Sequence, residues 1–160
     1  MIAQGEQAPE FELPDQDGRA VKLTDLRGTP VVLYFYPRAG TPGCTTQACG
    51  VRDHISDYAR YEASVVGVSP DPVDAVKEFH EDNALNFPLL ADEDHAVCEA
   101  YGAWGQRSSS QDGHGQIGAL RATFVIDDEG VVIHVIPRAD PSTHDAEVLA
   151  ALEASDARTP

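Results

Sequence analysis

The sequence has little of what membrane, secreted or nucleic-acid-binding proteins are built from. No uninterrupted apolar run approaches the ~20 residues that a membrane-spanning helix needs. Residues 1–5 form neither a basic nor an apolar stretch, so we expect no secretory signal and a cytoplasmic location. Positive charge is scarce, because 11 Lys and Arg face 27 Asp and Glu, which gives a formal net charge of −16. Such a surface would repel nucleic acids and anionic membranes, and we expect neither as a partner.

The excess of negative charge has two interpretations. Only two lysines occur, Lys22 and Lys77, so few of the acidic side chains can pair with a lysine. A solvated acidic surface that keeps the protein soluble is the simpler interpretation. A host with high internal salt, which would screen the self-repulsion, is the other.

Cysteine is also scarce, and its pattern limits the chemistry. The three cysteines, Cys44, Cys49 and Cys98, are an odd number in an apparently cytosolic chain, which argues against a disulfide framework. No C-x-x-C motif occurs, so a thioredoxin-type disulfide exchanger is disfavoured. Metal binding has little support, because the gap between Cys44 and Cys49 is wide for a zinc pair and His54 is followed by no visible third and fourth ligand. We therefore expect no metal site.

The hydrophobic pattern predicts an α/β fold in a single domain. A length of 160 residues suits one domain with one sizeable core, with residues 156–160 frayed. Apolar runs and turn residues alternate in the order hairpin, strand, helix, strand, helix, strand, helix, hairpin, helix. That order indicates a mixed central sheet flanked by helices, preceded by an N-terminal β-hairpin. The expected strands and hairpins are 10–13 with 20–23, 31–36, 65–68, 88–90, and 122–126 with 131–135. The expected helices are 44–61, 71–79, 93–101, and a last one capped by Ser142 with Asp145. Residues 105–118 are expected to form a surface loop.

Cys44 lies where a buried strand is followed by a loop and then a helix. Pro37 ends the apolar run 31–36, and the glycine-containing segment 38–43 leads into the helix. The first N–H groups of a helix lack intrahelical partners and the helix dipole is positive there, and both features favour a thiolate, the nucleophilic form of cysteine. A small buried hydrophobic residue is the structural alternative. The polar loop before Cys44 favours a reactive thiol at the carboxyl end of the sheet, where open α/β folds place their sites.

Cys49 is too far from Cys44 to bond with it inside a regular helix. Five residues at ~1.5 Å and ~100° each put the two Cα atoms roughly 8.6 Å apart, whereas a disulfide needs about 4.4–6.8 Å. If Cys49 reacts with an oxidised Cys44, the first helical turns must unwind. Gly50 would lower the cost of unwinding by ~1 kcal/mol relative to alanine. The alternative is that Cys49 is a buried spacer.

The residues around Cys44 resemble the peroxiredoxins. Pro37, Thr41 and Cys44 stand in the spacing Pro-x-x-x-Thr-x-x-Cys, and residues 40–49 read Gly-Thr-Pro-Gly-Cys-Thr-Thr-Gln-Ala-Cys, which is similar to the Q-type group, also called bacterioferritin comigratory proteins. Further similar segments are 8–11, 67–69, 87–92, 100–105 and 121–127. The resemblance covers nearly the whole chain. It implies a thioredoxin-like fold, a hydroperoxide substrate, thioredoxin as the usual reductant, and no metal or organic cofactor.

The resemblance also implies roles for individual residues. Cys44 would be the peroxidatic cysteine, which becomes a sulfenic acid, and Cys49 the resolving cysteine, which forms a disulfide with it. Thr41, together with the backbone N–H groups of Gly43 and Cys44, would bind the peroxide. Arg121 would favour the thiolate and clamp the substrate, because its guanidinium cannot deprotonate. Pro37 would shield the thiolate from water. The alternative for Arg121 is a solvated charge at the edge of an apolar strand.

Three features depart from the family pattern. Gln47 stands where the family often has a glutamate, so we expect slower turnover or a shifted pH profile. Cys98 replaces a small apolar residue and is expected in the core, with a back-up resolving thiol as the weaker interpretation. The loop 106–118 is less basic than the family's, which leaves reductant docking open. We expect a monomeric thiol peroxidase, and the alternatives are a thiol-based redox sensor or a general disulfide oxidoreductase.

Overall fold

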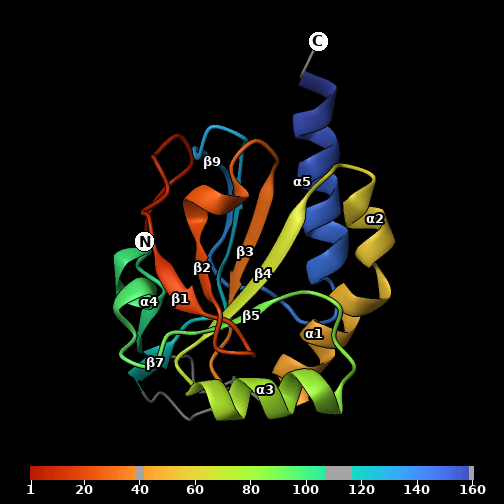
Figure 1. Cartoon of the computed structure of the whole chain (residues 1–160). Helices are drawn as coiled ribbons and strands as arrows, with labels where there is room; N and C mark the ends of the chain where they lie inside the picture. Colours follow the sequence, from red (N-terminus) through yellow and green to blue (C-terminus); the bar gives the residue numbers. More distant parts are fainter. Residues whose placement is uncertain (39–41, 107–116, 159–160) are drawn as a thin grey trace.

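The computed structural model describes residues 1–38, 42–106 and 117–158, with side chains through residue 154. Its centre is a five-stranded mixed sheet with the strand order β5-β4-β3-β8-β9 (Figure 1). Strands β3, β4 and β5 run parallel, whereas β8 is antiparallel to both β3 and β9. The strands are β3 (Val31–Phe35), β4 (Ser64–Ser69), β5 (Leu89–Ala91), β8 (Thr123–Ile126) and β9 (Val132–Ile136). The mixed α/β prediction is confirmed.

Helices cover one face of the sheet, and smaller elements cover the other. In Figure 1, α1, α2 and α5 lie to one side of β3 and β4, and α4 lies beside the β1–β2 hairpin on the opposite side. The helices are η1 (Leu23–Leu26, a 3-10 helix), α1 (Pro42–Asp53), α2 (Ile55–Ala59), α3 (Val73–Asp82), α4 (Ala96–Ala100) and α5 (His144–Arg158). The hairpins are β1 (Glu12–Pro14) with β2 (Ala20–Lys22), and β6 (Trp104–Gln106) with β7 (Ile117–Ala119). No helix in the described part of the chain is long and apolar enough to cross a membrane.

The side chains of the apolar run 31–36 are divided between two separate cores. Successive side chains of a strand point to opposite faces, so Val32 and Tyr34 pack under α1, α3 and α5. Leu33 and Phe35 pack with α4 and the N-terminal hairpin instead. Every residue of β3 is buried, which explains why this strand reads as a continuous apolar run rather than an alternating one.

The predicted helix 44–61 differs from the observed structure at both its start and its middle. Helix α1 already begins at Pro42, a tolerated first helical position, so Cys44 lies inside the first turn. The helix ends at Asp53, and α2 starts afresh at Ile55. At His54 the backbone leaves the helical region (φ −108°, ψ 14°), while its ring Nδ1 lies 2.9 Å from the carbonyl oxygen of Gly50. The break at His54 separates the segment that carries both active-site cysteine candidates from α2.

The other predicted helix ends also need correction. Helix α4 begins at Ala96 rather than 93, because the buried Asp92 carboxylate accepts the N–H groups of Val97 and Cys98. Ser142 does not cap α5, since its hydroxyl donates to Asp140. The remaining differences are small. Helix α3 runs from Val73 to Asp82 rather than over 71–79, with Pro72 as its N-cap. The ends of the loop 105–118 pair as β6 and β7, and α5 continues to Arg158 through part of the segment expected to fray.

The topology brings distant residues together at one end of β3. Because β8 runs antiparallel to β3, the start of β8 lies beside the end of β3, and the N–H of Phe35 donates to the carbonyl of Ala122 at 2.7 Å. Helix α1 follows β3 at this same end. The carbonyl of Arg121 accepts the N–H of Ala139 at 2.7 Å, which ties the segment before α5 to the same place. The start of α1, Arg121 and the start of α5 therefore converge.

Candidate active site

Cys44 and Arg121 meet inside the protein although they lie 77 positions apart in the chain. The Nη2 atom of Arg121 is 3.6 Å from Sγ of Cys44, and the two residues are only 5% and 1% exposed. A guanidinium cannot deprotonate, so a permanent positive charge stands beside the sulfur. The first turn of α1 adds N–H groups that have no partner within the helix, and the positive end of the helix dipole. The two effects act together to stabilise negative charge on Cys44.

Gln47 fixes the orientation of Arg121. It lies one helical turn after Cys44 on the same face of α1, and its Oε1 accepts a hydrogen bond from Nη1 of Arg121 at 2.9 Å. Gln47 is fully buried. The sequence marked Gln47 only as a departure from a family pattern, although its three-residue spacing from Cys44 already put both side chains on one helix face. The structure thus adds Gln47 to the site.

A neutral histidine lies near the guanidinium. His144, the first residue of α5, is buried, and its Nε2 is 2.9 Å from Oγ1 of Thr123. Burial lowers the pKa of His144 to about 4, and the positive charge of Arg121 contributes to this. The imidazole is therefore uncharged at neutral pH and does not compete with Arg121 as a cation. Nothing in the sequence around His144 pointed to this position.

Two tyrosines, one in β3 and one just after it, lie in the same buried cluster as Cys44. Tyr34 and Tyr36 are buried, with ring centroids 5.6 Å apart. Burial raises the pKa of both phenols, and negative charge on Cys44 raises them further. The hydroxyls therefore stay protonated, and the rings form a low-dielectric wall beside the thiol. In such surroundings the attraction between Arg121 and a Cys44 thiolate is stronger than in water.

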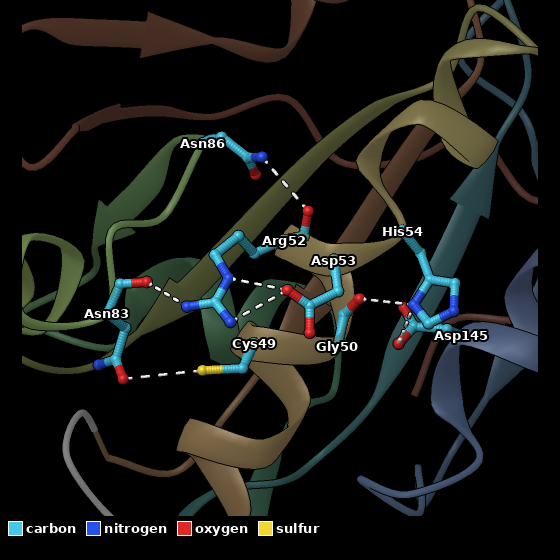
Figure 2. Close-up of polar contacts among 8 residues, drawn as sticks. All are labelled: Cys49, Gly50, Arg52, Asp53, His54, Asn83, Asn86 and Asp145. Atoms are coloured by element: carbon cyan, nitrogen blue, oxygen red, sulfur yellow. Dashed lines mark hydrogen bonds and ion pairs between the residues drawn. The ribbon is translucent and has the colours of Figure 1, made fainter.

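Cys49 has a different environment from Cys44. Its side chain is half-buried, and Sγ lies 3.7 Å from Oδ1 of Asn83 just after α3, as Figure 2 shows. All three cysteines are free thiols in the structure. The two thiols of α1 thus contact different elements, Cys44 the segment before β8 and Cys49 the end of α3. This agrees with the prediction that an intact helix keeps them apart.

The remaining predicted site residues are placed less completely. Pro37 lies two residues after the end of β3 and is partly exposed, and Gly43 lies in the first turn of α1 next to Cys44. Thr41 lies outside the described residues. Cys98 is fully buried, and burial raises the pKa of its thiol, which agrees with a core position. Among residues 1–38, 42–106 and 117–158, no group of His, Cys, Asp and Glu could hold a metal ion.

This arrangement can carry out nucleophilic substitution at a small substrate. A buried thiol supplies the nucleophile, and a fixed guanidinium beside it can hold an oxygen on which negative charge develops. His144 is hydrogen bonded to Thr123 and is uncharged at neutral pH, so the positive charge beside the thiol comes from Arg121. The geometry favours attack on a bond whose leaving group is an oxygen anion.

Comparisons with known proteins agree with this chemistry. Residues 4–135 match the AhpC/TSA family. The chain is 46% identical over 145 residues to peroxiredoxin Bcp of Escherichia coli K12, covering 91% of this chain and 92% of that protein. The crystal structure of peroxidoxin BcpB from Mycobacterium tuberculosis is similar with a TM-score of 0.85 and 38% identity, over 96% of this chain and 98% of that one. The bacterioferritin comigratory protein of Xanthomonas campestris, described for its alkyl peroxide reduction activity, has a TM-score of 0.83 and 30% identity, with 91% of each chain covered.

Proposed function

The chain belongs to the AhpC/TSA family and is a peroxiredoxin, a thiol peroxidase, and on that basis we propose that Cys44 is its peroxidatic cysteine and Cys49 its resolving cysteine. The observation that carries the proposal is the 3.6 Å approach of the Arg121 guanidinium to Sγ of Cys44 in a buried site. The substrates we propose are hydrogen peroxide and small organic hydroperoxides, because a buried thiol beside one guanidinium suits a small molecule with a reactive O–O bond. The whole chain, residues 1–160, would act as one thioredoxin-like domain.

In the first step, the Cys44 thiolate attacks one oxygen of the peroxide in line with the O–O bond. The S–O bond forms as the O–O bond breaks, and water or an alcohol leaves once the departing oxygen gains a proton. Charge on that oxygen would be stabilised by Arg121 and by the backbone N–H groups of Gly43 and Cys44. Thr41 is assigned to the same task from the sequence resemblance, and Pro37 to shielding the thiolate from water.

In the second step, the Cys49 sulfur attacks the Cys44 sulfenic acid. An S–S bond forms, the S–O bond breaks, and the hydroxyl leaves as water with the thiol proton. The helical spacing of roughly 8.6 Å between the Cα atoms exceeds disulfide geometry, so the turn between the two cysteines has to unwind. An external dithiol then reduces the disulfide and restores both thiols.

Thioredoxin is the reductant we propose, since the resemblance to Q-type peroxiredoxins implies it. A thioredoxin-recycled disulfide belongs in a reducing compartment, and the cytoplasm is therefore part of the proposal. Both thiols lie in one helix of one chain, so the cycle needs no second subunit, and we propose a monomer. Neither a metal nor an organic cofactor takes part in either step.

The test is NADPH consumption by the purified protein with thioredoxin and thioredoxin reductase, with and without peroxide. Peroxide-dependent consumption, together with a Cys44–Cys49 disulfide found by peptide mapping after one equivalent of peroxide, is the expected result. Cys49→Ser should still be oxidised once but should not turn over through this disulfide. A mapped disulfide that excludes Cys49, or NADPH consumption that needs no peroxide, would contradict the proposal.

A further inference from the structure

The thiol of Cys49, the proposed resolving cysteine, forms a hydrogen bond that points it away from Cys44. Cys49 follows Cys44 by five residues, which turns its side chain by ~140° around the helix axis. Accordingly Sγ of Cys44 faces Arg121 and Sγ of Cys49 faces Asn83, where the thiol can donate to Oδ1 at 3.7 Å. Cys49 cannot approach Cys44 until this contact with Asn83 is broken.

Asn83 is itself held firmly at the end of α3. Its Nδ2 donates to the carbonyl of Phe79 at 3.0 Å, within the last turn of that helix. Phe79 is buried and packs against Tyr36, with ring centroids 6.0 Å apart. The acceptor for the Cys49 thiol is thus fixed to the core through α3, so a movement of Cys49 has to break the contact and cannot carry Asn83 along.

Arg52 ties the backbone of the Cys49 turn to the same segment. Its Nη1 donates to the carbonyl oxygen of Asn83 at 2.7 Å, and its own carbonyl accepts Nδ2 of Asn86 at 3.3 Å. The guanidinium also pairs with Asp53 at 3.0 Å. Figure 2 shows these contacts side by side, with Asn83 and Asn86 facing the last turns of α1. Three hydrogen bonds therefore bind the Cys49 side of α1 to the segment that follows α3.

We propose that Asn83 and Arg52 are positioning residues that hold Cys49 away from Cys44 and set the rate at which the disulfide forms. The inference rests on the proposed function, in which Cys49 attacks the Cys44 sulfenic acid. That step is internally balanced, because the S–S bond replaces the S–O bond and water leaves with the thiol proton. The hydrogen bonds of Asn83 and Arg52 are present before the step and absent during it, so they slow it. They do not touch Cys44, so they leave its first oxidation unchanged.

The rate of this second step has a chemical consequence. While the sulfenic acid waits for Cys49, a second peroxide can oxidise it to the sulfinic acid, which the external dithiol does not reduce. A slower release of Cys49 lengthens that exposure. The contacts at Asn83 and Arg52 therefore determine how readily excess peroxide inactivates the enzyme.

The experiment separates the two steps in single-turnover reactions of the full-length protein with hydrogen peroxide. Samples are quenched with an alkylating reagent and a sulfenic-acid trap, and intact masses then give the rates of sulfenic acid and disulfide formation. Asn83→Ala removes the acceptor for the Cys49 thiol, and Arg52→Ala removes the link to the Asn83 carbonyl. Arg52→Lys keeps a cationic donor, and Arg60→Ala removes an exposed arginine from the end of α2 as the matched control.

Disulfide formation should be about three- to tenfold faster in Asn83→Ala and Arg52→Ala. This is the effect expected when one hydrogen bond is lost from the state in which α1 is intact and Cys49 contacts Asn83. Sulfenic acid formation should change less than twofold, and the sulfinic fraction at excess peroxide should fall by the same factor. Arg52→Lys should recover most of the wild-type rate, and Arg60→Ala should match wild type. If Asn83→Ala does not fold, Arg52→Ala and Arg52→Lys carry the test alone.

The outcomes distinguish this inference from the proposed function. A wild-type protein that forms a sulfenic acid but never the Cys44–Cys49 disulfide would overturn both. A disulfide that forms at the same rate in wild type, Asn83→Ala and Arg52→Ala would overturn the positioning role and leave the peroxidase cycle intact. Slower disulfide formation in either alanine variant would equally overturn it.

Discussion

The carboxylate of Asp145 lies where a Cβ atom on Gly50 would be, so that α5 occupies the space a side chain on α1 would need. Asp145 accepts a hydrogen bond from the hydroxyl of Tyr58 and lies 3.7 Å from Nδ1 of His54. Its side chain is only 13% exposed, and burial raises its pKa. Gly50 therefore leaves room for α5 to pack against α1, in addition to lowering the cost of unwinding the helix.

Gly50→Ala is expected to destabilise the protein by about 1–3 kcal/mol, because the new methyl group must push Asp145 off its partners. In an exposed helix the same change stabilises by ~1 kcal/mol. Urea unfolding measures the difference. In an Asp145→Ala background the clash is gone, and Gly50→Ala should become stabilising. Equal effects of Gly50→Ala in both backgrounds would contradict the contact.

Arg121→Gln should lower the second-order rate of Cys44 oxidation by about a hundredfold, because it removes the charge that faces the sulfur and that we propose stabilises the leaving oxygen. Arg121→Lys keeps a charge but lacks the planar fork, so we expect an intermediate rate. Stopped-flow measurement of the first turnover gives these rates. Arg138→Gln, a change of an exposed arginine near the start of α5, is the control. A folded Arg121→Gln variant with the wild-type rate would remove Arg121 from the site.

Gln47→Ala should both destabilise the protein and slow Cys44 oxidation. It leaves an Nη1 donor of the buried Arg121 without its 2.9 Å partner, at a cost of about 1–3 kcal/mol. Gln47→Glu restores an acceptor but adds negative charge beside Cys44, so the pH at which the oxidation rate is half-maximal should rise. Urea unfolding and a pH series of first-turnover rates test both statements. An unchanged pH profile in Gln47→Glu would show that this position does not act on the thiol.

Acid should destabilise the protein partly through His144. The folded pKa of about 4 lies below the ordinary value of 6.5, so the unfolded chain binds the proton first. The stability that the buried, neutral imidazole provides is complete above pH 6.5. It is lost as the pH falls through the folded pKa of about 4, by about 3 kcal/mol in total. Urea unfolding at pH 7.0, 5.5 and 4.5 should show a shallower pH dependence in His144→Gln than in wild type or in the control His134→Gln. Identical slopes would show that His144 is not held neutral by the fold.

The sequence predicted elements well where the pattern is local and poorly where a tertiary contact decides. The buried strand at 31–36 and the hairpin of β8 and β9 follow from apolar runs and turn residues, and both are confirmed. The prediction missed the break at His54 and placed the start of α4 too early. Each of these features depends on a side chain that hydrogen bonds to nearby backbone groups.

The candidate site divides in the same way. Cys44 was predicted to be a reactive thiol from its place at the start of a helix, whereas Arg121 was identified only through a resemblance to known sequences, and the structure places the two side chains together. Gln47 could have been found from its spacing on the helix. His144 and Asn83 could not, because only the tertiary packing of α5 and α3 brings His144 near Arg121 and Asn83 to Cys49, and a single sequence carries no signal for that packing.

The central claim is that Cys44 is the thiol that reduces the peroxide. The most direct test is the rate of peroxide loss in a single turnover of wild type, Cys44→Ser, Cys49→Ser and Cys98→Ser. Wild type, Cys49→Ser and Cys98→Ser should each consume one equivalent at similar rates, whereas Cys44→Ser should consume none above the buffer background. Peroxide loss at the wild-type rate in Cys44→Ser would contradict the account.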